Sequence, residues 1–322
     1  MITDTSFTIY HEHFKTDFRV HRIPDNENLD AWVNCQTHSN IVTCLDAFKA
    51  KGPDGQVRHF SMTETSSEGH SNPNMYQFIE SLNLNLAIDV PRYYLELIYD
   101  MGIQLATALD FAHNSGLVHG QLDLSKVVIQ KEGDNLIFKI TDFAPTSQLD
   151  VPTSSEAHDW PFARTKNNAT HHDKLEALML KDIYTLGICL LEMMIGRISK
   201  KKCSITLDSV PLTWAEFPES TPLCQVLVEC INIDSTTHRK GKLQHIRKLL
   251  IREYKKFFQR TFYKMEKPYT GKKWDVYNKR GIVAFYRGKQ EEALRLWSEA
   301  LDLYDRHFDA QVNFSMHRWS SG

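Results

Sequence analysis

Glycine is missing from the first 51 residues, although the chain of 322 residues has 14 glycines. A loop that brings backbone N–H groups close to phosphates needs glycine, because a side chain blocks the approach. The opening segment is therefore not expected to form a glycine-rich phosphate loop. Long apolar runs are also absent. The strongest one, at residues 186–195, includes Glu192 and is too short to span a membrane.

Other motifs that the sequence lacks exclude further classes of protein. None of the six cysteines has Cys-x-x-Cys spacing, which excludes the common zinc and redox motifs. The amino terminus has no basic segment before an apolar run, so no signal peptide is expected and the cytoplasm or nucleus is the expected location. The net charge is only −2, from 38 basic and 40 acidic residues, so nucleic acid is not an expected partner of the whole chain. A membrane is not an expected partner either.

The composition is that of a globular protein, with 42% hydrophobic and 24% charged residues. The residue pattern predicts strands in the amino-terminal part of the chain and mostly helices in the remainder. Strands are expected at 14–23, 41–48, 57–63, 127–130 and 136–140, and the last two should form a hairpin. Helices are expected at 90–113, 180–195 and within 211–230, while 144–180 should be irregular. Gly116 is expected to cap the carboxyl end of the long helix.

Residues 239–280 are strongly basic, with fifteen Lys and Arg against three acidic residues. Apolar residues recur there at spacings of three and four, which predicts an amphipathic helix with a basic outer face. Two interpretations stand: a solvated face over a docked apolar stripe, or a surface for an acidic partner. Residues 267–273 read as a linker.

Residues 274–322 alternate small and aromatic side chains over two helices, a pattern that lets antiparallel helices pack closely. The pattern resembles a tetratricopeptide repeat (TPR), and its opening aromatic is Tyr277. The other matching residues are Gly281, Ala284, Ala293, Trp297 and Ala300. An ordinary helical hairpin is the alternative. A second unit begins near Gln311, so we expect an incomplete array that docks on the basic helix or continues.

Four motifs occur in order. They are His38-Ser-Asn-Ile-Val42, Val118-His-Gly-Gln-Leu-Asp-Leu-Ser-Lys126, Thr141-Asp-Phe-Ala144 and Asp182-Ile-Tyr-Thr-Leu-Gly187. Their order and spacing resemble the protein kinase superfamily over residues 14–255. The resemblance implies an α+β, bilobal fold with a strand-rich N-lobe and a helical C-lobe, followed by the all-α TPR-type hairpin. The implied boundaries are 1–65, 66–238, 239–273 for the basic helix and linker, and 274–322.

The resemblance also shows which catalytic positions are altered. Gln121 stands where the family has its catalytic aspartate, and an amide cannot accept the substrate proton. Asp123 replaces a lysine, and Lys126 replaces an asparagine that holds Mg²⁺. No intact catalytic residue is therefore expected.

Nucleotide-binding positions are altered as well. His21 stands at the position of the strand lysine that pairs with phosphates, and Asp142 is the one remaining Mg²⁺ carboxylate. An adenine slot would lie beside Thr63, Glu64 and Thr65. By contrast, the scaffold positions match the family. They are His119, Phe143, Asp182 and Gly187.

These differences predict a pseudokinase, a kinase-like fold without phosphoryl transfer. It would be a scaffold that binds other proteins through its kinase-like and TPR surfaces. No cofactor is required, and any binding of ATP and Mg²⁺ should be weak. The alternative is a divergent Ser/Thr kinase that uses Asp142 or Asp123.

Overall fold

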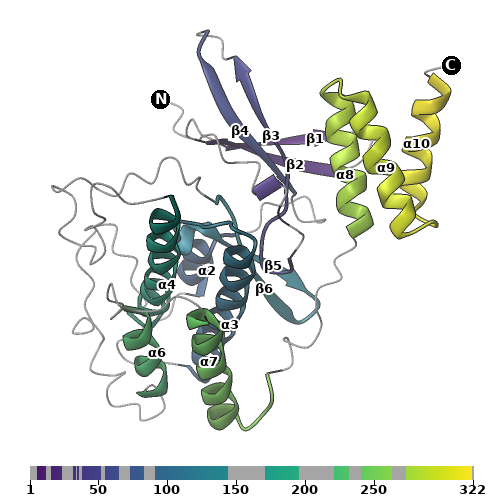
Figure 1. Ribbon diagram of the computed structural model, residues 1–322. Coiled ribbons are helices and arrows are strands. Elements are labelled where there is room, and N and C mark those ends of the chain that lie inside the picture. Colours follow the sequence, from purple (N-terminus) through teal and green to yellow (C-terminus); the bar gives the residue numbers. More distant parts are fainter. Residues whose placement is uncertain are drawn as a thin grey trace. The chain divides into compact units, whose positions relative to one another are not determined.

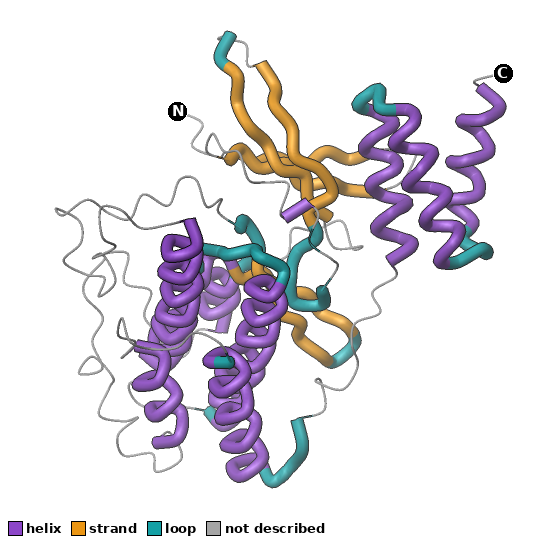
Figure 2. Tube along the Cα trace, viewed as in Figure 1, coloured by secondary structure: helices purple, strands orange, loops and turns teal. Residues whose placement is uncertain are grey.

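The computed structural model comprises two compact units (Figures 1 and 2). One contains residues 1–71 and 267–322, and the other contains residues 72–266. The structure describes residues 6–11, 16–23, 32–33, 35, 38–51, 55–64, 73–82, 91–143, 171–195, 221–231, 241–262 and 273–320. Part of the segment expected to be irregular, 144–170, lies outside these ranges, as do Thr65 and Ala144.

A four-stranded antiparallel sheet opens the first unit. Its strands are β1 (Ser6–His11), β2 (Thr16–Ile23), β3 (Cys44–Lys51) and β4 (Val57–Glu64). Their order is β1-β2-β4-β3, so β2 and β4 are central. Phe18 and Val20 alternate with Arg19 along β2, which places the two buried apolar side chains on one face of the sheet and Arg19 on the other.

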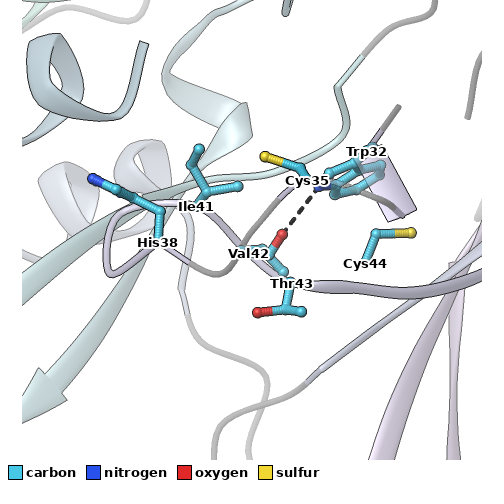
Figure 3. Close-up of a pocket in the computed structure, with 7 residues that line it drawn as sticks. All are labelled: Trp32, Cys35, His38, Ile41, Val42, Thr43 and Cys44. Atoms are coloured by element: carbon cyan, nitrogen blue, oxygen red, sulfur yellow. Dashed lines mark hydrogen bonds between the residues drawn. The ribbon is translucent and has the colours of Figure 1, made fainter. Parts of the chain in front are cut away.

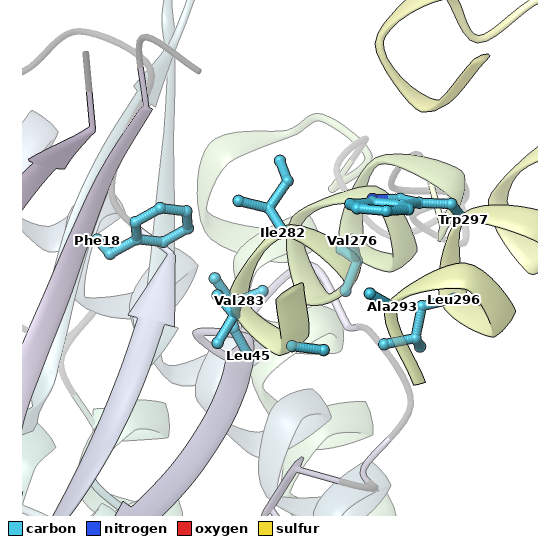
Figure 4. Close-up of a cluster of buried hydrophobic side chains, with 9 residues drawn as sticks. Phe18, Leu45, Val276, Ile282, Val283, Ala293, Leu296 and Trp297 are labelled. Atoms are coloured by element: carbon cyan, nitrogen blue, oxygen red, sulfur yellow. The ribbon is translucent and has the colours of Figure 1, made fainter. Parts of the chain in front are cut away.

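Three helices at the end of the chain complete this unit: α8 (Lys273–Tyr286), α9 (Gln290–Leu303) and α10 (Phe308–Ser320). Helix α8 packs against α9 and also against β3. Phe18 and Leu45 from the sheet share one apolar cluster with Val283 of α8 and Trp297 of α9 (Figure 4). The sheet and the helices therefore share one core.

The α8–α9 contact depends on a small residue. A Cβ on Gly281 would lie 2.6 Å from Cδ1 of Trp297, which is closer than real Cβ atoms approach. Gly281 thus makes room for the indole ring, whose Nε1 donates a hydrogen bond of 3.2 Å to the carbonyl of Asn278. This is the small-and-aromatic packing that the sequence predicted.

The second unit is mostly helical. Its elements are α2 (Met75–Leu82), α3 (Arg92–Asn114), η1 (Leu124–Lys126), β5 (Val127–Glu132), β6 (Asn135–Ile140), α4 (His171–Ile195), α6 (Thr221–Ile231) and α7 (Lys242–Phe258). Helix α3 lies at its centre and packs against α4, α7 and β6. Gly116 follows α3 with φ +73°, as its predicted capping role requires.

Most predicted elements are present, with shifted ends. One prediction was wrong: residues 171–180 are helical, not irregular, and extend α4 towards its amino end. The polar sequence of that first turn hides the apolar period that a buried helix shows. Helix α7 is amphipathic as predicted, with Leu243, Ile246, Leu250 and Tyr254 buried.

Candidate functional site

The candidate site is the segment from Val118 to Phe143, which connects α3 to the β5–β6 hairpin and continues beyond it. Asp182, fully buried on α4, fixes this segment. Its carboxylate accepts hydrogen bonds from the backbone N–H of His119 at 2.8 Å and of Gly120 at 2.6 Å. Gly120 has φ +72°, a conformation that glycine adopts without strain. One buried carboxylate therefore sets the backbone of the whole loop.

The ionisation of Asp182 supports this role. Burial raises the pKa of Asp182, but the hydrogen bonds and charges of His113, 2.9 Å away, and of His119 together outweigh burial and lower the pKa overall. Asp182 thus remains a carboxylate able to accept several hydrogen bonds.

His119 and Phe143 pack together at the centre of the loop. Their ring centroids are 5.1 Å apart, and both side chains are buried. The His119 Nε2 lies 2.9 Å from the carbonyl oxygen of Thr141. Burial lowers the pKa of His119, so its neutral form is favoured. His119 and Phe143 thus form a buried aromatic contact beside the backbone that Asp182 holds.

Gly187 is the fourth predicted scaffold residue, and it lies within α4. A Cβ at this position would lie 2.6 Å from Cβ of Cys230 on α6. Gly187 therefore allows α4 and α6 to pack closely, which is a structural role.

Gln121 and Asp123, two of the altered catalytic positions, belong to local hydrogen bonds of the loop. Gln121 is exposed, and its backbone N–H donates to Nδ1 of His119 at 3.2 Å. The carboxylate of Asp123 instead begins the short helix η1, where it accepts hydrogen bonds from the backbone N–H of Ser125 at 2.7 Å and from the Ser125 hydroxyl. Asp123 thus acts as a helix cap.

Lys126 and Asp142 form an ion pair. The Lys126 Nζ donates to Oδ2 of Asp142 at 2.9 Å, while the other carboxylate oxygen accepts from the hydroxyl of Thr141 at 3.3 Å. Asp142 has φ +56°, which orients its side chain in this arrangement. The ammonium group thus occupies the carboxylate that the family uses for Mg²⁺. In this position, the Lys126 ammonium group would repel a divalent cation from the same oxygen atoms.

The adenine-slot candidates lie at the end of β4. Thr63 is buried, and its hydroxyl donates to the carbonyl of Arg19 at 3.4 Å. Glu64 accepts from the hydroxyl of Thr43 at 3.0 Å, and its own backbone N–H donates to the carbonyl of Thr43 at 3.2 Å. The backbone of His21 pairs with Ser61 at the centre of the sheet. Both Thr63 and Glu64 are therefore bonded within the sheet, so their side chains and the Glu64 N–H are already engaged.

The first predicted motif forms a tight turn beside a small cavity (Figure 3). The backbone N–H of Asn40 donates to Nδ1 of His38 at 3.1 Å. Trp32 forms part of the cavity wall, and its Nε1 donates a hydrogen bond of 3.1 Å to the carbonyl of Val42. The cavity volume of about 10 Å³ admits at most one water molecule, so we assign it no ligand.

A carboxylate that sequence analysis did not select lies near Asp123. Glu192 of α4 is largely buried and accepts a hydrogen bond of 3.3 Å from the hydroxyl of Tyr76 on α2. Burial, with a smaller contribution from Asp123, raises the pKa of Glu192 to about 7, although the Tyr76 hydrogen bond acts against this rise. Its position inside an apolar run was the one available signal.

The described residues offer neither a metal-binding cluster nor a membrane-spanning helix. No cluster of three His, Cys, Asp or Glu side chains could hold a metal ion there. Likewise, no described helix combines the length and apolar character needed to cross a bilayer.

Comparison with known proteins identifies relatives of this arrangement. Residues 32–235 match the family model described as "Protein tyrosine and serine/threonine kinase". A Clostridium perfringens protein named "Probable serine/threonine-protein kinase" is 26% identical over 164 residues. The aligned part covers 44% of this chain and only 22% of that relative.

Two solved structures share the fold. The Mycobacterium tuberculosis PknI kinase domain has a TM-score of 0.50 and 13% identity, and the match covers 77% of this chain and 90% of that one. A mutant of the Neurospora crassa PAN3 pseudokinase has a TM-score of 0.52 and 17% identity, with coverage of 94% and 66%. The same fold therefore occurs in a protein named as a kinase and in one named as a pseudokinase.

Proposed function

The chain belongs to the protein tyrosine and serine/threonine kinase family, and we propose that within this family it is a pseudokinase that acts as a protein-binding scaffold. The Lys126–Asp142 ion pair carries this proposal. Phosphoryl transfer needs a metal ion to neutralise charge on the phosphates and a carboxylate to accept the substrate proton. Here an ammonium group holds the metal carboxylate, and Gln121 stands at the position of the base.

The scaffold residues support the same proposal. Asp182, His119 and Phe143 keep the contacts that hold the loop in shape. A loop that is fully supported yet lacks its reacting groups suits a protein whose shape is used for binding.

The test is incorporation of labelled phosphate from ATP with Mg²⁺ or Mn²⁺. The wild-type chain and the Asp142→Asn variant are expected to give the same background signal. Incorporation that disappears in the Asp142→Asn variant and persists in a Lys131→Asn control would disprove the proposal.

That last outcome would favour the alternative, a divergent Ser/Thr kinase. The name of the Clostridium relative supports this alternative, although the match covers a small part of that protein. Asp123 is its other candidate base, and Asp123→Asn would then also abolish incorporation. Because Asp123 caps η1, the control is Ser125→Ala, which removes the hydrogen bond from the Ser125 hydroxyl to Asp123 without removing a carboxylate.

The helical end supports the TPR part of the proposal. Helix α10 begins 34 residues after Trp274, near the start of α8, and 34 residues is the repeat length of TPR proteins. The two buried amides Asn278 and Asn313 are hydrogen-bonded at 2.9 Å, which joins α8 to α10. We interpret α8 and α9 as one repeat and α10 as the first helix of the next.

The basic helix supports a second kind of partner. Exposed Lys248, Arg252, Lys255 and Lys256 follow one side of α7, while Glu253, which pairs with Arg252 and Lys256, is the one carboxylate of this helix. At the helix ends, Lys242 and Arg260 are already paired with Glu229 and Glu96. We propose that Lys248 and Lys255, with Arg252 and Lys256 whose charge Glu253 partly neutralises, bind an acidic polypeptide segment.

A labelled poly-glutamate peptide is the probe for this surface. Its affinity should fall at least tenfold between 50 and 200 mM salt and in the Lys248→Glu/Lys255→Glu variant. Lys131→Glu, an exposed charge reversal on β5, is the control. Binding that is indifferent to salt would contradict an electrostatic surface.

A further inference from the structure

Glu192 connects two helices that lie far apart in the sequence. It belongs to α4, and its carboxyl group accepts a hydrogen bond of 3.3 Å from the hydroxyl of Tyr76 on α2. Helix α2 is short and packs mainly on η1 and β5. The Glu192–Tyr76 hydrogen bond therefore adds a link from α2 to α4.

The titratable groups closest to Glu192 are themselves acids. Asp123 lies just before η1, and its charge raises the pKa values of Glu192, Tyr76 and the buried thiol of Cys189. Cys189 lies one turn before Glu192 on α4. Among the described residues, no Lys, Arg or His pairs with Glu192. The carboxyl group is therefore not neutralised by a cation in this part of the structure.

Two other described helices, α3 and α6, pack on α4. Next to Glu192, α3 presents Tyr94, whose hydroxyl donates to the carbonyl of Met193 at 2.9 Å. From α6, Cys230 lies beside Gly187, more than one turn before Glu192. These helices thus bring neutral hydroxyl and thiol groups to this part of α4.

A carboxyl group in such surroundings is more stable with its proton. Ionisation would add a second negative charge near the Asp123 carboxylate and would keep that charge from full contact with water. Burial, the largest cause, raises the pKa of Glu192 to about 7, with Asp123 adding to the rise and the Tyr76 hydrogen bond opposing it. Glu192 therefore exchanges its proton near neutral pH.

Asp123 connects this proton to the loop of the candidate site, because its carboxylate caps η1 through the backbone N–H of Ser125 at 2.7 Å. We propose that Tyr76, Asp123 and Glu192 form a proton-dependent latch, which holds α2 and η1 closed while Glu192 is neutral and releases them when it is ionised. An ionised Glu192 repels the capping carboxylate, and it gains water when α2 moves away. The latch depends neither on the loss of catalysis nor on the repeat relation of the helical end.

Hydrogen exchange of the full chain at pH 6 and pH 8 tests the latch, with each rate divided by the intrinsic rate at that pH. With a pKa of about 7 in the closed form and 4.5 in the open form, linkage predicts that protection of the α2 amides falls about tenfold from pH 6 to pH 8. The peptide that contains Ser125 should follow. Glu192→Gln should be equally protected at both pH values, and Glu80→Gln, an exposed change on α2, should behave as the wild type.

Two further variants test the direction of each contact. Asp123→Asn retains a side chain that can cap η1 but removes the charge that raises the pKa of Glu192, so the fall should be smaller than in the wild type. Tyr76→Phe removes the hydrogen bond that lowers this pKa, so protection should be lower at both pH values and the fall larger. A purely structural contact would change protection by the same factor at pH 6 and pH 8.

A third condition, 1 M urea, shows whether α2 opens by itself. Local opening exposes little surface, so exchange in α2 should respond to urea much less than exchange at the centre of α3. An equal urea response in α2 and α3 would overturn the latch, because α2 would then open only with the whole unit. Protection of α2 that is constant between pH 6 and pH 8, or that falls equally in Glu192→Gln, would overturn it as well.

Discussion

At the scale of single residues, Lys126 is the most informative position. Lys126→Asn restores the family's residue and releases the Asp142 carboxylate. We expect Mg²⁺ with ATP to raise the unfolding midpoint of this variant relative to ATP with EDTA, and to leave the wild-type midpoint unchanged. Loss of the pair itself should cost only about 0.5 kcal/mol, because both side chains are partly exposed.

Differential scanning fluorimetry measures this response, and Lys131→Asn is the control for losing a lysine. A wild-type chain that Mg²⁺ stabilises as much as the variant would contradict the claim that Lys126 excludes the metal. If Mg²⁺ with ATP raises the unfolding midpoint of neither protein, the ammonium group of Lys126 is not what prevents binding.

Glu192 makes a second residue-scale prediction, which concerns pH. Its pKa is raised to about 7 in the folded chain, while an unfolded chain ionises it near 4.5. A raised pKa means that the unfolded state releases this proton first, so stability falls as pH rises from about 4.5 to 7 and remains low above that. Allowing for its partial exposure, we expect a loss of about 2 kcal/mol.

The Glu192→Gln variant removes this titration and retains a group that Tyr76 can contact. Urea unfolding at pH 5 and pH 8 should therefore show a smaller loss for the variant than for the wild type. Glu229→Gln is the control, because the hydrogen bond from Lys242 lowers the pKa of Glu229. An identical pH dependence of wild type and Glu192→Gln would disprove the assignment.

These residues also show what sequence can predict about a site. The motifs selected Asp182, His119 and Phe143, and the structure places all three around one loop. Such a role depends on a residue type at a fixed place in the fold. The motifs could not predict the Lys126–Asp142 pair. A motif gives the position of a substituted residue, but a long lysine side chain can point in many directions, and only packing selects one.

At the scale of elements, the α8–α9 contact depends on Gly281. Gly281→Ala places a methyl group where the indole of Trp297 lies, so the helices must separate. We expect a loss of about 2 kcal/mol in unfolding free energy, although alanine has the higher helix propensity. Glu292→Ala on the exposed side of α9 is the control. Stabilisation by Gly281→Ala would mean that α8 and α9 do not pack as described.

Elements were predicted more reliably than their contacts. The apolar periods gave α3, α7 and the β5–β6 hairpin, because local spacing determines those structures. The contact of α8 with the sheet joins residues more than 200 positions apart, such as Arg280 and Cys44, and no local period records it. Residues 171–180 were missed because their first turn is polar.

At the scale of the whole molecule, the chain forms two units, and one of them combines residues from both ends of the sequence, 1–71 and 267–322. The strands of the first unit share their core with α8 and α9, so damage to α8 should reach the strands. Val283 is buried between α8 and the sheet, and Val283→Asp would place a charge in that core.

Hydrogen exchange measured by mass spectrometry tests this division. In Val283→Asp, the amides of β2, β3 and β4 should exchange at least tenfold faster, together with those of α8 and α9. The amides of α3, α4 and α7 should keep their wild-type rates, because their core contains none of the altered contacts. Val228→Asp, at an exposed position of α6, is the matched control and should change neither unit. If only the amides of α8 to α10 exchange faster and those of the strands keep their protection, the stability of the sheet does not depend on the helices. That result would contradict the shared core of the sheet and helices α8 and α9.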